Sequence, residues 1–329
     1  MFPDTGLKGV HGASISDVMH ATLLSHRGRG FGVPEGSLTA LDRALAAGAR
    51  YVEIDTRVSL DGELLVYHDV WLDSLCVETG LVSNHHVSNS GAPTFRGAQG
   101  EQVATFQQFV ERFAAADTDA ELMVDIKDGG FEVEHLEVLR YYGVIDRCWV
   151  VAWAPEILLR IHELEPRLRL SFSHIGLTDW RSSFGRYLAW LGDGSWIRRA
   201  ASGLPLRGSQ KNLERVVLYH DSLHLAPQPG GRIIGQFPIH ILSRLPGGAL
   251  GEALRSSRGS VGTAAPFCTR EFVRRAHDAG LSAFVFSLDQ AESALKVKLD
   301  TEVDVVFTNR ADMFDVDWSS LPARVPRGY

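Results

Sequence analysis

The sequence has few cysteines and lacks long hydrophobic runs. Cys76, Cys148 and Cys268 are an odd number and form no CxxC pair, so they predict neither a disulfide framework nor a structural zinc site. No stretch reaches the roughly eighteen apolar residues of a membrane span, and the N-terminus does not have the pattern of a secretory leader. We therefore expect a cytoplasmic protein, in a reducing compartment and without a membrane span.

Two further absences narrow the class of partner. The chain has 33 lysines and arginines against 40 aspartates and glutamates, a formal charge of −7, and no basic run, so nucleic acid is not an expected partner. It also lacks a GxxxxGK[ST] motif, so no cradle for a nucleoside triphosphate is implied. At 45% hydrophobic residues, its 329 residues suffice for a large core, as in two small domains or one barrel.

Short apolar segments alternate with helical patterns along the chain, which is typical of repeated βα units. Seven segments are predicted strands: 21–26, 50–56, 121–127, 148–153, 168–174, 281–289 and 303–310. Helices are predicted after a Ser37 cap and at 106–116, 155–164 and 272–280. An eighth strand is expected within 215–226. This count favours a single (β/α)8 (TIM) barrel domain over residues 1–329 rather than a doubly wound sheet.

Two regions do not follow the alternation. Residues 70–102 show no clean period and contain several glycines, so we expect an inserted loop module after the second strand. Residues 176–266 are rich in glycine, serine and proline, and we expect irregular extra segments there. His85 and His86 lie within the first of these regions in a polar run, which favours a solvated loop over a metal site.

Acidic side chains recur on one face of two predicted strands. Alternation puts Glu53 and Asp55 on the same face, and Asp125 and Lys127 on the same face of another strand. In a barrel these side chains face inward near the carboxyl ends of the strands, where barrel enzymes have their active sites. Buried like charges require a cation, which is either a hard divalent metal or paired arginine and lysine.

Two histidines complete the predicted rim. His26 ends the first strand, and His68 follows the extended segment "LLVY" after an Asp-Gly turn. Carboxylates, a lysine and two histidines together suit phosphoryl chemistry, because imidazoles move protons near neutral pH and cations balance phosphate oxygens. The glycines of "HRGRGFG" let the backbone approach an anion, and Arg27 either binds phosphate or braces the loop through Glu35 or Asp55.

Five ordered motifs carry a resemblance to a known family. "HRG", "PEGS", "EID", "DGELLVYHD" and "DIK" follow one another between residues 24 and 128. They resemble the glycerophosphodiester phosphodiesterase pattern HRG, PENT, ExD, DGxxVxxHD and ExK. "FSLD" and "FTNR" stand where that family has WTVN and TDRP. The resemblance implies a (β/α)8 barrel and hydrolysis of phosphodiesters to an alcohol and a phosphomonoester.

The resemblance also implies roles for individual residues. A Mg²⁺ or Ca²⁺ ion would be held by Glu53, Asp55 and Asp125, and His26 and His68 would form the acid–base pair. The residues that would contact the phosphate or the rest of the substrate are Arg27, Lys127, Glu35, His174, Phe286 and Asn309. For Glu35 a brace and a ligand remain equal alternatives, and His174 is included because it closes a predicted strand.

Several positions depart from the family pattern, which indicates that the chemistry is kept and the substrate has changed. Asp125 replaces the commoner glutamate, Gly36 the asparagine of PENT, Phe286 a tryptophan and Asn309 the aspartate of TDRP. We expect a small polar substrate, either a sugar phosphodiester of the kind agrocinopine phosphodiesterases hydrolyse or a glycerophosphodiester. The alternatives are a phospholipase-like hydrolase acting on phosphatidylglycerol or a related lipid, and a non-catalytic phosphodiester-binding barrel.

Overall fold

The computed structural model describes residues 14–173, 225–227, 233–235 and 245–321, and eight parallel strands within them form a closed ring. In order around the ring these are β1 (Leu23–His26), β11 (Val305–Thr308), β10 (Ser282–Phe286), β9 (Ser260–Ala264), β6 (Arg169–Ser173), β5 (Cys148–Ala152), β4 (Glu121–Ile126) and β2 (Tyr51–Val58). The pairing of β1 with β2 closes it. The predicted (β/α)8 barrel is confirmed.

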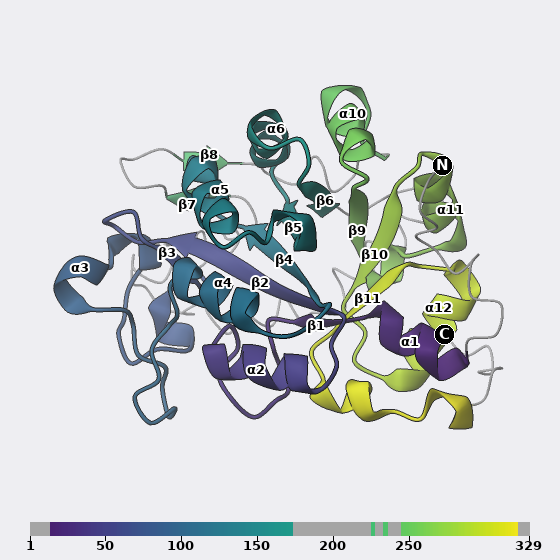
Figure 1. Ribbon diagram of the computed structural model, residues 1–329, viewed down its shortest axis with the longest axis horizontal. Coiled ribbons are helices and arrows are strands. Elements are labelled where there is room, and N and C mark those ends of the chain that lie inside the picture. Colours follow the sequence, from purple (N-terminus) through teal and green to yellow (C-terminus); the bar gives the residue numbers. More distant parts are fainter. Residues whose placement is uncertain (1–13, 174–224, 228–232, 236–244, 322–329) are drawn as a thin grey trace, which may run out of the picture.

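Helices surround the ring of strands (Figure 1). They are α1 (Ile15–Thr22), α2 (Leu38–Ala46), α4 (Phe106–Ala115), α5 (Glu132–Tyr141), α6 (Pro155–Leu164), α10 (Gly248–Ser256), α11 (Arg270–Asp278) and α12 (Ala291–Thr301), whereas the short α3 (Val87–Ser90) lies to one side, in the segment between β3 and α4. The Ser37 side chain accepts a hydrogen bond from the Ala40 N–H, so the predicted cap of α2 is confirmed. No helix in the described part of the chain is both long enough and apolar enough to cross a bilayer.

Strand alternation divides the core into two layers. On β2, Val52 and Ile54 face outward and pack in the large cluster between the strands and the helices. The inside of the barrel is filled by a second apolar cluster of Leu24, Met123, Trp149, Val151, Phe284, Val305 and Phe307. Above this cluster, towards the carboxyl ends of the strands, the inward side chains become charged.

The prediction of the eighth strand was wrong. Residues 215–224 lie outside the described residues, and Leu225–Pro227 is strand β7, which pairs with β8 (Ile233–Gly235) in a separate two-stranded sheet. The ring is instead completed by β9, whose sequence "SVGTA" pairs with β6 and β10. In the part of the expected irregular region that the structure describes, α10, which packs against α6 and β6, and β9 follow the regular alternation of helix and strand.

The segment expected as an insertion lies between β3 (Leu64–Val66) and α4. Strand β3 turns back on β2 through the Asp-Gly turn and pairs with it in antiparallel fashion. Beyond β3 the chain forms short bridges and turns around an apolar cluster of its own, made of Leu65, Tyr67, Leu72, Cys76, Val82, Phe95 and Val103. Asp61 accepts hydrogen bonds from His86 and from the Val87 and Ser88 N–H groups, and His85 lies 2.8 Å from the Gly91 carbonyl.

Candidate active site

Neighbouring strands bring the predicted acidic and basic residues to one level of the barrel. His26 of β1 is in register with Glu53 of β2, and Asp55 of β2 is in register with Asp125 of β4. Glu53, Asp55 and Asp125 are at most 5% exposed. The predicted inward face of β2 is therefore confirmed, and Lys127, directly after β4, joins it.

The loop after β1 needs its glycines. Gly30 has φ +85°, and a Cβ there would lie 2.6 Å from the Ala311 nitrogen and 2.7 Å from the Asn309 carbonyl oxygen. Gly36 has φ +72° and donates its N–H to the Arg27 carbonyl. Asparagine is one of the few other residues that adopt a positive φ, so this conformation suits both Gly36 and the asparagine of PENT. Arg27 itself has φ +59°, a conformation that non-glycine residues adopt at functional sites more often than elsewhere.

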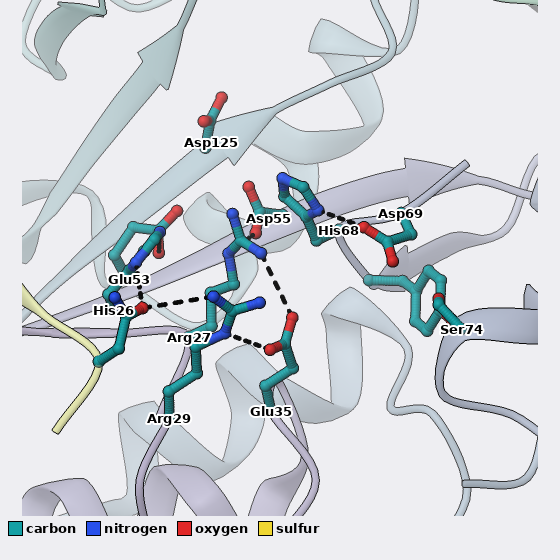
Figure 2. Close-up of polar contacts among 12 residues, drawn as sticks. His26, Arg27, Arg29, Glu35, Glu53, Asp55, His68, Asp69, Ser74 and Asp125 are labelled. Carbon is teal, nitrogen blue, oxygen red and sulfur yellow. Dashed lines mark hydrogen bonds and ion pairs between the residues drawn. The ribbon is translucent and has the colours of Figure 1, made fainter. Parts of the chain in front are cut away.

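Two cations share the carboxylate of Asp55. Arg27 Nε lies 2.8 Å from Asp55 Oδ2, and Lys127 Nζ lies 2.8 Å from Asp55 Oδ1 and also contacts Asp125. On the other side, Arg27 reaches Glu35 at 3.3 Å, and Arg29 also pairs with Glu35 (Figure 2). Glu35 therefore holds the two arginines of the loop together, which is the brace alternative for this residue.

Burial and neighbouring charges separate the pKa values of the three carboxyls. Burial opposes the charge of Asp55, but Arg27 and Lys127 outweigh burial and lower its pKa. Burial, and then the charge of Asp55, raises the pKa of Glu53 well above its ordinary value. Burial also raises the pKa of Asp125, although Lys127 opposes this. The two cations thus favour the charge of Asp55 most and leave Glu53 and Asp125 short of positive charge.

A divalent ion fits this deficit. Glu53, Asp55 and Asp125 each offer an oxygen, and these oxygens lie within 4.8 Å of one another. Glu53 Oε2 and Asp125 Oδ1 are buried and receive no hydrogen bond within the described residues. Carboxylate oxygens are the ligands that Mg²⁺ and Ca²⁺ prefer. The residues present therefore fit a hard divalent cation, and the donor set does not choose between the two.

The environment of His26 favours a neutral ring. Its Nδ1 lies 2.8 Å from Asn309 Oδ1, and its Nε2 lies 3.7 Å from Glu53 Oε2. Burial, and then the charge of Arg27, lowers the pKa of His26 well below its ordinary value. The ring also makes an edge contact with Phe307, with 5.6 Å between the ring centroids. A neutral imidazole is able to accept a proton.

His68 has a charged partner instead. Its Nδ1 lies 2.6 Å from Asp69 Oδ1, and the Arg57 Nε donates to the His68 carbonyl, which fixes the backbone. Burial, and then Arg27, lowers the pKa of His68 to about 4. Asp69 opposes that shift, because a carboxylate next to an imidazole favours the imidazolium. In the view of Figure 2, His26 and His68 lie on either side of Arg27.

Two further predicted residues lie beside His26. Asn309 follows β11 directly and contacts the ring, while Phe286 ends β10. Phe286 packs edge-to-face with Phe307 and with Trp153, with centroid distances of 6.2 and 5.7 Å. The rings thus continue from the buried Phe307, which His26 contacts, to the partly exposed Phe286 and Trp153. The predicted His174 lies outside the described residues.

Sequence reasoning passed over three groups near the site. In the sequence, Arg29 stands only as part of a glycine-rich loop, and Ser287 and Asp289 only as part of "FSLD". The structure places Arg29 NH1 3.4 Å from Asn309 Oδ1, with Ser287 and Asp289 on the other side of the same amide. One signal was available, since Asp289 lies in the short turn after β10, a strand that neighbours β11.

Curated proteins with similar sequences are phosphodiesterases. The glycerophosphodiester phosphodiesterase of Caldanaerobacter subterraneus subsp. tengcongensis is 25% identical over 162 residues, which cover 46% of this chain and 66% of that protein. The probable glycerophosphodiester phosphodiesterase 1 of Mycobacterium tuberculosis (strain H37Rv) is 44% identical over 64 residues, 20% of this chain and 23% of that protein. The matches thus span less than two thirds of these relatives' length.

Solved structures and a family model extend the comparison. A phosphodiesterase from Oleispira antarctica, in complex with its product sn-glycerol-3-phosphate, aligns with a TM-score of 0.59 at 16% identity over 91% of this chain and 97% of that one. A glycerophosphodiester phosphodiesterase from Agrobacterium tumefaciens aligns at 0.56 and 19% identity over 89% and 98%. At these identities the likeness concerns the fold. The model of the glycerophosphoryl diester phosphodiesterase family matches residues 26–195, just over half of the chain, and the chain therefore belongs to that family.

Proposed function

We propose that this protein is a metal-dependent phosphodiesterase that hydrolyses a small polar phosphodiester to an alcohol and a phosphomonoester. One observation carries the proposal: the cations Arg27 and Lys127 lie over a cluster of three buried carboxyls, and a histidine stands on each side. Family membership supports the same reaction. So does the sn-glycerol-3-phosphate bound as product in the Oleispira antarctica relative, because it is a phosphomonoester.

The charged residues have two roles, which are to bind the phosphate group and to hold the metal ion. Arg27 and Lys127 bind the phosphodiester anion and orient its phosphorus between the two histidines. A divalent ion held by Glu53, Asp55 and Asp125 supplies, when bound, further positive charge for the phosphate oxygens. Both roles stabilise the negative charge that increases on the phosphoryl group in the transition state.

The histidines move the protons. His26, neutral at physiological pH, accepts a proton from the attacking water as the water oxygen bonds to phosphorus. His68 donates a proton to the alcohol oxygen as the phosphorus–oxygen bond to it breaks. A bound phosphodiester adds negative charge beside His68, which raises its pKa, and Asp69 stabilises the protonated ring. The neutral amide on His26 and the carboxylate on His68 favour this division of roles.

The substrate we propose carries a sugar. Phe286 and Trp153 are partly exposed, and they continue the buried Phe307 ring beside His26 with aromatic surface on which a pyranose or furanose ring can pack. Arg29 and Asn309 add hydrogen-bonding groups next to it for hydroxyls. A glycerol moiety would contact less of this aromatic surface, and a lipid chain would make no hydrogen bonds with Arg29 and Asn309.

Turnover of a panel of diesters tests both levels of the proposal. Protein loaded with Mg²⁺ is assayed with a disaccharide-type sugar phosphodiester, glycerophosphocholine, glycerophosphoethanolamine and phosphatidylglycerol, with released alcohol and phosphomonoester both measured. We expect the highest kcat/KM for the sugar diester, and His26→Gln as a control should reduce turnover at least a hundredfold. A preference for a glycerol ester would refute the substrate but keep the reaction. A preference for phosphatidylglycerol would favour the lipid hydrolase, and binding without turnover would favour a non-catalytic barrel.

A further inference from the structure

The side chain of Asn309 links His26 to the carboxylate of Asp289, in the turn after the neighbouring strand β10. Its Oδ1 lies 2.8 Å from His26 Nδ1. Its Nδ2 lies 2.9 and 3.2 Å from the two oxygens of Asp289 and 2.9 Å from Ser287 Oγ. An asparagine amide has a donor end and an acceptor end. A group that fixes the donor end on one side therefore leaves the acceptor end for the group on the other side.

Neighbours on both sides fix the orientation of this amide. An ionised carboxylate only accepts hydrogen bonds, so the NH2 end of Asn309 must face Asp289. A guanidinium only donates, and Arg29 NH1 lies 3.4 Å from the other end, so that end must be the oxygen. The orientation of the amide therefore follows from a guanidinium that only donates hydrogen bonds and a carboxylate that only accepts them, and not from the placement of the amide atoms alone.

The fixed amide selects one form of the His26 ring. Because Asn309 presents an oxygen, His26 Nδ1 must carry the proton and donate it. The lone pair of the neutral ring is then on Nε2, and this is the nitrogen that faces Glu53 and the carboxylate cluster. With the amide reversed, the lone pair would lie on Nδ1 and point away from the cluster.

We propose that Asp289 is a positioning residue, which sets the Nδ1–H form of His26 through Asn309 and so keeps Nε2 free as the base. The proposal deepens the proposed function and depends on it only for the reaction that His26 serves. Asp289 is itself held in place, because the Asn309 backbone N–H donates to its Oδ1 at 2.8 Å and the Thr308 hydroxyl lies 3.4 Å from the same atom. Asp289 is exposed and has no contact of its own with His26 in the described residues, so it acts through Asn309.

The first test observes the ring directly. Long-range ¹H–¹⁵N spectra of the whole protein distinguish the two neutral forms of a histidine, and loss of one signal in His26→Gln assigns it. We expect wild-type His26 with its proton on Nδ1. In Asp289→Asn, whose amide can present either end to Asn309, we expect the Nε2–H form to become populated. The matched control is Asp312→Asn, which removes one nearby negative charge that pairs with Arg310 and not with Asn309.

The second test measures the reaction. Asp289→Asn should lower kcat roughly tenfold to a hundredfold, as loss of a group behind a ligating or catalytic residue commonly does, with KM and the thermal midpoint nearly unchanged. Asn309→Asp alone brings two carboxylates together and should cost more. Combining it with Asp289→Asn again leaves one carboxylate and one amide, with an acceptor towards His26 Nδ1, and should recover activity above that of Asn309→Asp.

Several results of these two tests would overturn the proposed role of Asp289. Wild-type His26 with its proton on Nε2, or an unchanged ring and kcat in Asp289→Asn, would overturn the proposal. So would equal losses in Asp289→Asn and Asp312→Asn, because these would indicate a general effect of charge. If the protein hydrolyses no phosphodiester, the ring form in the spectra still tests the proposal, and only the proposed function fails.

Discussion

His135 should make the protein lose stability in mild acid. It lies in α5 and is 1% exposed, with its ring packed against Phe106 at 5.1 Å between centroids. Its Nδ1 lies 2.7 Å from the Phe131 carbonyl, which only accepts, so Nδ1 carries the proton and Nε2 accepts from the Thr56 hydroxyl at 2.9 Å. Burial lowers the pKa of His135 from 6.5 to about 4, so the folded protein holds this ring neutral.

The sign and size follow from linkage. Because the folded pKa lies below the unfolded one, unfolding takes up a proton when the pH lies between the two values. The contribution of His135 to stability is therefore complete above pH 6.5 and is lost progressively as the pH falls to about 4. At about 1.4 kcal/mol per pH unit between the two pKa values, the loss amounts to about 3 kcal/mol.

Urea denaturation followed by circular dichroism at pH values from 7 to 4 checks this. The free energy of unfolding of His135→Gln should be lower than that of wild type at pH 7, but should fall about 3 kcal/mol less towards pH 4. The control His20→Gln, at an exposed position on α1, should keep the wild-type pH dependence. Equal pH dependence of wild type and His135→Gln would refute the reasoning.

Three other outcomes are expected. Chelation should abolish turnover, and adding Mg²⁺, Mn²⁺ or Ca²⁺ should restore it. Mg²⁺ should also raise the melting temperature, and this rise should be smaller in Asp125→Asn. Full activity after exhaustive chelation would contradict the metal site. Asp128→Asn should cost about 3 kcal/mol in urea unfolding, because Arg57 NH1, 2.8 Å from Asp128 Oδ1, would remain buried without its partner, whereas a loss under 1 kcal/mol would argue against this. An aryl leaving group needs no acid, so it should partly rescue His68→Gln and not His26→Gln; equal rates for the two variants would leave the roles unsupported.

The sequence predicted the fold best where strand alternation and the order of elements along the chain determine the structure. The shared face of Glu53 and Asp55 follows from period two alone, and α6 covers the predicted 155–164. The eighth strand was misplaced because "SVGTA" carries small side chains and no apolar run.

Within the site, the sequence predicted which residues reach the rim but not their partners. Motif order places His26 and Asn309 at the ends of strands far apart in the chain, and only the closed ring makes β1 and β11 neighbours. The contact of Asn309 with Asp289 depends on the conformation of the turns after β10 and β11, and no periodicity encodes these turns. For the same reason, Arg29 was not distinguished from an ordinary loop arginine.

The segment between β3 and α4 has an apolar cluster of its own, so its residues are constrained mainly by one another and not by the packing of the barrel. Its members pack on one another, with Tyr67 reaching Ser74 Oγ at 2.9 Å, and largely not on the helices that surround the barrel. We therefore expect substitutions and length changes in this segment to be absorbed locally, so that the barrel that positions the charged residues keeps its stability. The segment begins at Tyr67, one residue before His68, so the surroundings of this histidine can diverge between relatives while the strands beneath stay the same.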